Sequence, residues 1–153
     1  MRIRAFLLPL ATIALVACNE GTTTSPTTES TATATVASAS STDTFIGQLL
    51  VRGTLYFTFD VTQYGTVEAT LTSVSGAGVP TTVQVRLGVG TLTDTTTDEG
   101  TVTSCSLSTS LLTKAGSTAQ VTTTLSAGTY CVSVGDVGNL FAPADVAVSI
   151  AHP

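Results

Sequence analysis

The chain has 153 residues, of which 42% are hydrophobic and only 10% charged, so it has room for one domain of ordinary size. Five basic residues against ten acidic ones give a formal charge of −5, which argues against nucleic-acid binding, where affinity comes from neutralising phosphates. A single histidine excludes multi-histidine metal sites and leaves little for acid–base catalysis. We therefore expect neither an enzyme nor a cofactor.

A short apolar segment follows two arginines at the N-terminus. Residues 1–4 contain Arg2 and Arg4, and residues 5–17 then form an apolar run of 13 residues. A transmembrane helix needs about 20 apolar residues, whereas a signal peptide needs a basic start and a short apolar core. Residues 1–17 are therefore predicted to be a signal peptide.

The signal peptide ends at Leu15-Val16-Ala17-Cys18, which resembles the lipobox of bacterial lipoproteins. The resemblance implies a diacylglycerol on the Cys18 thiol, cleavage before Cys18, and further acylation with chains such as palmitate. Two or three acyl chains, at about 0.8 kcal/mol per buried methylene, would hold the protein stably in a bilayer. Asn19, in place of an aspartate, predicts outer-membrane delivery where the sorting rules of enterobacteria apply. The alternative is an ordinary secretory signal followed by an unrelated cysteine.

The next segment, residues 18–44, is predicted to be a disordered linker after the lipidated Cys18. Ten of the 26 residues from 19 to 44 are threonine and five are serine, too polar a composition to offset the entropy of ordering. The segment is either a plain spacer or an O-glycosylated stalk. Without Arg2 and Arg4 the formal charge becomes −7, which predicts repulsion from an anionic membrane surface.

From residue 45 onward apolar and polar residues alternate with a period of two, which predicts strands with one buried face. The alternating runs lie at 54–61, 66–72, 82–89, 119–125, 130–134 and 146–150. Glycine-rich turns separate them, and only residues 107–115 suggest a helix, of a turn or two at most. Residues 45–153 are thus predicted to be all-β, an antiparallel β-sandwich of seven or eight strands. A closed barrel is the alternative.

Two cysteines remain in the predicted body of this exported chain, Cys105 and Cys131. They are expected to form a disulfide, worth about 3 kcal/mol for a loop of this length. The alternative, a metal bound by the two thiolates, is a poor zinc site without a nearby histidine. Because Cys131 alternates with Tyr130 and Val132, the bridge is expected on an outer face of the sandwich.

One segment resembles a known bacterial family. Residues 125–134 read LSAGTYCVSV, similar to the "L-x-A-G-T-Y-x-V-x-V" segment of bacterial pre-peptidase C-terminal (PPC) domains. Residues 57–61 resemble that family's early "Y-x-F-x-V" strand, and residues 146–150 its closing strand. Leu55 stands where the family often has aspartate, and Asp145 and Val146 where it often has tyrosine. The resemblance implies a jelly-roll-like sandwich without a catalytic centre, of a kind that accompanies secreted hydrolases.

The densest acidic stretch, with Asp94, Asp98 and Glu99, is a weak candidate for calcium binding. Its spacing matches no familiar calcium loop, so a solvated hairpin loop is the alternative. Asp136 and Asn139 form a still weaker candidate of the same kind. No metal site is assigned to this chain.

Aromatic side chains suggest two binding candidates. Phe141 lies in a loop before the last strand, where it either contacts a partner or closes the end of the core. Tyr64, like Tyr56, offers a face for stacking on a sugar. His152 is next to the C-terminus, where fraying argues against catalysis, and no Gly-x-Ser-x-Gly motif is present.

The sequence as a whole predicts a membrane-anchored extracytoplasmic lipoprotein whose β-sandwich works by binding or as a structural component. Its expected partners are the bilayer, through acylated Cys18, and an envelope protein or polysaccharide. The alternative is an accessory domain that recruits a secreted hydrolase or its substrate to the cell envelope.

Overall fold

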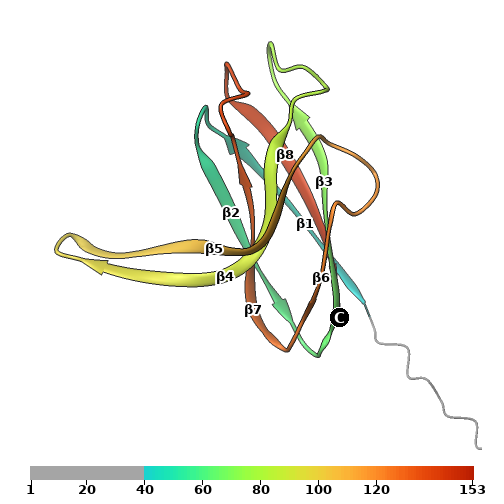
Figure 1. Ribbon diagram of the computed structural model, residues 1–153, viewed down its shortest axis with the longest axis vertical. Coiled ribbons are helices and arrows are strands. Elements are labelled where there is room, and N and C mark those ends of the chain that lie inside the picture. The colour runs from blue at the N-terminus through green and yellow to red at the C-terminus, as the bar shows by residue number, and fades with distance from the viewer. Residues whose placement is uncertain (1–39) are drawn as a thin grey trace, which may run out of the picture. The chain divides into compact units, whose positions relative to one another are not determined.

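Eight strands and their connections make up the described part of the chain, which is residues 40–153 of a computed structural model (Figure 1). The predicted signal peptide, Cys18 and the linker up to residue 39 lie outside the described residues. Within residues 40–153, no helix is long and apolar enough to cross a bilayer. The strands are β1 (Ser41–Leu49), β2 (Thr54–Val61), β3 (Gly65–Ser75), β4 (Val85–Thr97), β5 (Gly100–Thr113), β6 (Val121–Leu125), β7 (Gly128–Gly135) and β8 (Ala144–His152).

The strands form two four-stranded sheets in which every pairing is antiparallel. One sheet has the order β1-β8-β3-β6 and the other β2-β7-β4-β5. Consecutive strands change sheet at every step except between β4 and β5, which is the connectivity of a jelly roll. The predicted antiparallel sandwich is therefore confirmed, and the closed barrel is not formed.

The core lies between the two sheets and follows from the period-two pattern. In β8, for example, Ala144, Val146, Val148 and Ile150 are at most 1% exposed, and the residues between them point outward. Because β8 is central, with β1 on one side and β3 on the other, these side chains are covered by neighbouring strands as well as by the facing sheet. In the sequence, the apolar residues of the alternating pattern thus mark the buried face of a strand, and the residues between them mark its outer face.

Two predicted boundaries differ from the structure. The first strand begins at Ser41, inside the segment assigned to the linker, because residues 41–44 pair with residues 149–152 of β8. The helix suggested for residues 107–115 is wrong, since these residues lie mostly in β5 and pair with β4. In both places pairing with another strand, β8 in the first case and the preceding β4 in the second, decides the conformation of a segment whose own sequence is weakly patterned.

Strand β4 is longer than the predicted run at 82–89, and β5 is not among the predicted runs. The outer parts of both strands leave the sandwich. Residues 91–97 and 100–106 pair only with each other and form a ribbon, here called the arm, that projects to the left in Figure 1. The register shifts between Val89 and Gly90, where the arm begins. A Cβ atom on Gly90 would lie 1.9 Å from the Ser106 carbonyl oxygen, so only glycine fits this close approach of two backbones.

A disulfide ties the base of the arm to β7. Cys105 and Cys131 are bonded, with their Cα atoms 5.9 Å apart, which confirms the predicted pairing. Cys131 lies on the face of β7 opposite to the core residues Val132 and Val134, as its place in the alternation predicted. It is nevertheless 0% exposed. A second link joins the arm to the sandwich: the hydroxyl of Tyr56 donates a hydrogen bond of 3.2 Å to the Thr103 carbonyl oxygen.

Candidate functional site

Three connections meet at one end of the sandwich: residues 50–53 between β1 and β2, residues 76–84 between β3 and β4, and residues 136–143 between β7 and β8. We call them the loop end. The pairing of Leu49 with Ala144 places it at the opposite end from Ser41, which pairs with His152. The loop end is therefore the end of the body opposite to Ser41, the first residue of β1.

The carboxylate of Asp136 holds two of these loops together. Its Oδ2 accepts a hydrogen bond from the backbone N–H of Arg52 at 2.7 Å. Its Oδ1 accepts three more, from the N–H groups of Gly138 at 3.0 Å, Asn139 at 2.8 Å and Leu140 at 3.1 Å. One carboxylate thus satisfies four backbone donors, and it leaves little freedom to either loop.

Two further hydrogen bonds complete the link between the loops. The N–H of Asp136 donates to the Gly53 carbonyl oxygen at 2.9 Å. The side-chain amide of Asn139 donates to the Gln84 carbonyl oxygen at 2.9 Å, which attaches the third loop. The Asp136-Val137-Gly138-Asn139 sequence, which suggested a weak calcium site, therefore caps backbone groups instead. An aspartate with a glycine and an asparagine two and three residues later is typical of a turn in which the carboxylate accepts backbone hydrogen bonds.

Asp136 should make the loop end sensitive to acid. Burial, the largest single influence, raises the pKa of Asp136, but its four backbone hydrogen bonds together leave the pKa below the ordinary value of 3.8. Since the charged form is favoured in the folded protein, its stabilisation is complete above the unfolded-state pKa near 3.8. It is lost as the pH falls through the lower folded-state pKa.

Replacing Asp136 with asparagine is expected to lower the free energy of unfolding by about 1–3 kcal/mol, because amide hydrogens would face backbone donors. The variant should also lose the acid-dependent part of its stability. Urea unfolding at neutral pH and below pH 3.8 measures both effects. Asp145→Asn, at an exposed carboxylate on β8, is the control and should stay within about 0.5 kcal/mol. Equal behaviour of the two variants would contradict the role given to Asp136.

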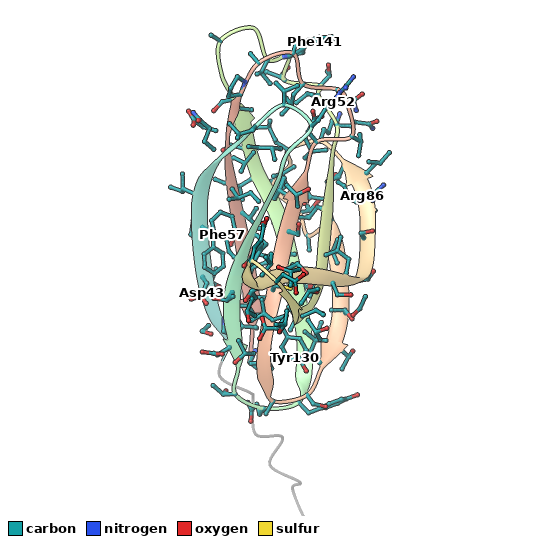
Figure 2. The ribbon with its side chains drawn as sticks, turned by 90° about the vertical axis from the view of Figure 1, so that its left-hand side faces the viewer. Asp43, Arg52, Phe57, Arg86, Tyr130 and Phe141 are labelled. Atoms are coloured by element: carbon teal, nitrogen blue, oxygen red, sulfur yellow. A yellow bond between two sulfur atoms is a disulfide. The ribbon has the colours of Figure 1, made fainter. Side chains whose placement is uncertain are left out.

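The loop end exposes apolar side chains at its tip. Phe141 is 90% exposed and Leu50 is 58% exposed, with Val51 and Val137 each at 41%. The core is closed at this end by Leu140, which is only 3% exposed. Of the two readings of Phe141, contact with a partner is thus favoured over closing the core, since its neighbour fills that role. Figure 2 shows Phe141 and Arg52 together at this end, with Arg86 nearer the middle of the body.

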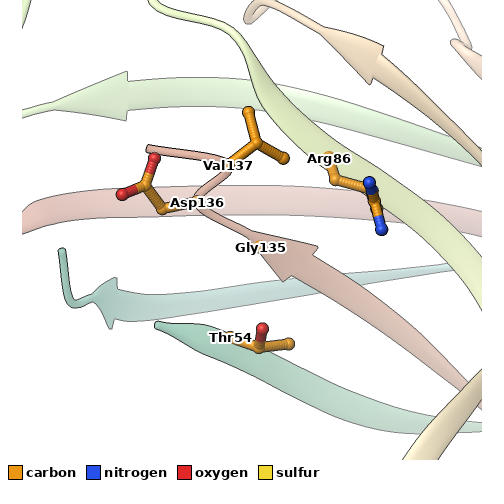
Figure 3. A pocket seen from close by; sticks show the side chains of 5 residues that line it. All are labelled: Thr54, Arg86, Gly135, Asp136 and Val137. Carbon is orange, nitrogen blue, oxygen red and sulfur yellow. The ribbon is translucent and has the colours of Figure 1, made fainter. Parts of the chain in front are cut away.

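Basic side chains accompany the apolar ones. Arg86 lines an open pocket of about 350 Å³ with Thr54, Gly135, Asp136 and Val137 (Figure 3). Within residues 40–153, the guanidinium groups of Arg86 and Arg52 form no ion pair and no hydrogen bond. Both are free to bind an anionic group from outside. Sequence reasoning missed both arginines, because neither lies in a recognisable motif.

Arg52 carries backbone strain. Its φ angle is +58°, in the left-handed region, within a turn closed by the Gly53 N–H and the Leu50 carbonyl oxygen at 2.9 Å. A non-glycine residue there costs about 1–2 kcal/mol. Arg52→Gly is therefore expected to raise the free energy of unfolding by about 0.5–1 kcal/mol, after the entropy of glycine is counted. Thermal unfolding compares it with Arg86→Gly, in a strand, which should be destabilised instead.

The remaining predicted site residues are not brought together. Tyr64 is 73% exposed in the connection between β2 and β3, at the end away from the loop end. Asp94 lies in the arm, where its Oδ1 accepts a 2.6 Å hydrogen bond from Thr103. Asp98 and Glu99 form the turn at the tip of the arm. In the part of the chain that the structure describes, no three histidine, cysteine or acidic side chains gather closely enough to hold a metal ion.

His152 was expected to fray but is only 5% exposed, at the end of β8, where the Thr62 N–H binds the Pro153 carbonyl oxygen at 3.0 Å. Its Nε2 lies 3.1 Å from Asp43 Oδ2, and the Ser41 hydroxyl oxygen lies 3.2 Å from both ring nitrogens. These three residue types also form hydrolase triads. A triad serine must align with one ring nitrogen while aspartate binds the other. The Ser41 oxygen is equidistant from both nitrogens, which differs from that arrangement, and the hydrogen bonds of the cluster join the start of β1 to the end of β8.

Comparison with known proteins adds no relative: no protein-family model matches the chain, and no curated protein sequence matches it. A functional assignment for this protein therefore rests on the residues of the loop end and on the N-terminal sequence.

Proposed function

We propose that this protein is a lipid-anchored lipoprotein of the bacterial cell envelope whose β-sandwich is a non-catalytic binding module. Acylated Cys18 is the anchor, residues 19–40 are the linker, and the loop end is the binding surface. The anchor follows from the resemblance of residues 15–18 to a lipobox after a short signal-like segment. In a Gram-negative organism, Asn19 favours the outer membrane.

One observation carries the binding role: four exposed apolar side chains lie on two loops that Asp136 holds rigidly, at the end of the sandwich opposite to Ser41. Apolar side chains gathered at one place on a surface mark interaction sites more often than scattered ones do. Because the loops are already ordered by hydrogen bonds, little conformational entropy is lost when a partner binds.

Intact mass spectrometry of the protein extracted from native membranes tests the anchor. The expected mass is that of residues 18–153 with two or three acyl chains, increased by two hydrogens after reduction and unfolding, when the disulfide opens. An unacylated mass would overturn the lipoprotein assignment and send the search for the protein to the culture medium.

Photo-crosslinking in cells tests the binding surface. A photoreactive amino acid in place of Phe141 should yield adducts with envelope components. The matched control is the same amino acid in place of Ile46, which is 75% exposed but lies on β1, away from the loops. Adducts of equal kind and yield from both positions would overturn the loop end as the binding surface.

A second candidate function, an accessory domain for a secreted hydrolase, is favoured by one observation. The strand order is that of a jelly roll, the architecture implied by the resemblance of residues 125–134 to PPC domains. Co-purification of the acylated protein with a secreted hydrolase would support this function. If the native protein purifies without any hydrolase from cells that secrete them, it is rejected.

A further inference from the structure

The tip of the loop end carries strongly exposed apolar side chains, and their exposure restricts the kind of partner that fits it. Phe141 lies on one connection, and Leu50 and Val51 on the neighbouring one, and the backbone hydrogen bonds of Asp136 join the two. A side chain that is 90% exposed on a projecting loop fits a protein partner only if that partner offers a matching pocket. The interface of a lipid bilayer accepts such side chains whatever their shape.

Charge at this end differs from that of the rest of the body. All three basic residues after the predicted signal peptide lie at this end: Arg52 on the same turn as Leu50 and Val51, Arg86 at the start of β4, and Lys114 directly after Thr113, which pairs with Val85. The negative charge of Asp136 faces four backbone N–H groups. Asp145, one residue into β8, is the other acidic group nearby. A locally basic end on an acidic protein is complementary to an anionic surface.

The strained backbone of Arg52 also supports binding of an anionic partner by this end. A glycine would suit the φ of +58° better, yet the chain has an arginine whose guanidinium forms no ion pair and no hydrogen bond within residues 40–153. Strained backbone that packing does not explain tends to occur at functional sites. The guanidinium of Arg52 is therefore the feature of this turn that a binding function requires.

We propose that the loop end docks on an anionic lipid bilayer, with Phe141, Leu50 and Val51 inserted into the interface and the guanidinium groups of Arg52 and Arg86 against the headgroups. The inference rests on the proposed use of the loop end as the binding surface, and it names the partner. It does not require the acyl chains. A lipoprotein of this kind would contact membrane at both ends, through Cys18 at one and through the tip at the other.

Vesicle co-sedimentation tests the docking. The protein used is residues 18–153 with Cys18→Ser, so that no acyl chain contributes, and the disulfide is checked by mass in every variant. It should bind vesicles of phosphatidylcholine and phosphatidylglycerol, and bind pure phosphatidylcholine far more weakly. Phe141→Ser should weaken binding by at least about tenfold, the effect of losing a buried aromatic side chain. Ile46→Ser, the matched control at an exposed apolar residue of β1, should bind like the parent protein.

The arginines are tested in the same assay. Arg52→Gly and Arg86→Ala should each weaken binding by about fivefold, and added salt should reduce the difference. Lys114→Ala removes the third positive charge of this end and should also weaken binding. Thr66→Glu changes the net charge by the same amount at an exposed residue near the opposite end of β3, and it should have a smaller effect. If Thr66→Glu matches the arginine variants, the attraction is a property of the net charge, and docking by this end is overturned.

Insertion is measured directly by fluorescence, because the chain contains no tryptophan. Phe141→Trp places a single reporter at the tip, and its emission should shift to the blue when anionic vesicles are added. Ile46→Trp should show no shift. A blue shift of both reporters, or of neither, would overturn insertion of the tip.

These outcomes separate the inference from the proposed function. If the protein binds no vesicles while Phe141 cross-links specifically to an envelope protein, the bilayer is the wrong partner and the binding surface is right. If neither assay depends on Phe141, both the inference and the proposed binding surface are rejected.

Discussion

Replacing Gly90 with alanine is expected to lower the free energy of unfolding by about 3 kcal/mol or more, the upper end of the usual effect of overpacking. The added Cβ would lie 1.9 Å from the Ser106 carbonyl oxygen, 2.6 Å from its carbon and 2.7 Å from Leu107 Cα. All three are backbone atoms, which no rotamer change moves away. The variant must therefore separate β4 from β5 where the arm begins, next to the shift in register at Val89.

Chemical denaturation of the Gly90→Ala protein measures this effect. Gly135→Ala is the matched control, because Gly135 also lies in a strand and the nearest atom there is the side-chain oxygen of the exposed Thr54, at 3.3 Å. It should lie within about 0.5 kcal/mol of the parent protein. Similar stability of the two variants would mean that the approach of β4 and β5 at Gly90 is not as close as described.

Removing the disulfide is expected to have the second large effect. The double variant Cys105→Ala and Cys131→Ala should lose about 3 kcal/mol, because the bridge closes a sequence separation of 26 residues. Alanine is preferred to serine at Cys131, which is completely buried and would enclose a serine hydroxyl. The loss should concentrate in the arm, whose other described link to the sandwich is the Tyr56–Thr103 hydrogen bond.

Two measurements check this expectation. Amide hydrogen exchange of residues 91–106 should accelerate more than that of β8 in the core. The reduced parent protein should match the double variant in urea unfolding, since both lack only the bridge. Unchanged exchange in the arm would show that pairing between β4 and β5 alone holds it in place.

The net charge predicts repulsion from an anionic membrane, whereas the distribution of charged residues over the fold allows one end to bind it. The formal charge of −7 for the chain after its signal peptide predicts repulsion from anionic membranes. Arg52 and Arg86 lie 34 positions apart in the sequence and are brought to one end by the fold. Net charge describes long-range repulsion, which salt screens over about 10 Å, whereas docking depends on the groups within that distance. The vesicle experiments decide between the two.

Much of the body was predictable because its signals are local. Alternation in segments such as residues 144–152 identifies a strand and its buried face without knowledge of its neighbours. The pairing of Cys105 with Cys131 was predictable since only these two cysteines remain in the body, and the position of Cys131 in its strand assigned it to the outer face.

The residues of the candidate site were less predictable. Phe141 was recognised as an apolar residue in a loop, but whether it closes the core depends on Leu140, which the fold buries in its place. The turn that Asp136 makes with Gly138, Asn139 and Leu140 is local, but its fourth backbone partner, the N–H of Arg52, is 84 positions away. No local pattern records a contact of that separation.

By itself, then, the sequence determined the all-β class, the faces of most strands and the pairing of the two cysteines, because each depends on nearest neighbours or on composition. Only the tertiary structure decided that β1 begins at Ser41, that residues 91–106 leave the sandwich as an arm, that His152 is buried, and that three loops form one end. For β1, His152 and the loop end, the outcome depends on which distant strand or loop a segment meets, and for the arm it depends on where β4 stops pairing with β7. That choice is made by the packing of the whole sandwich, since many segments of this Thr-rich chain have similar propensity for β-structure.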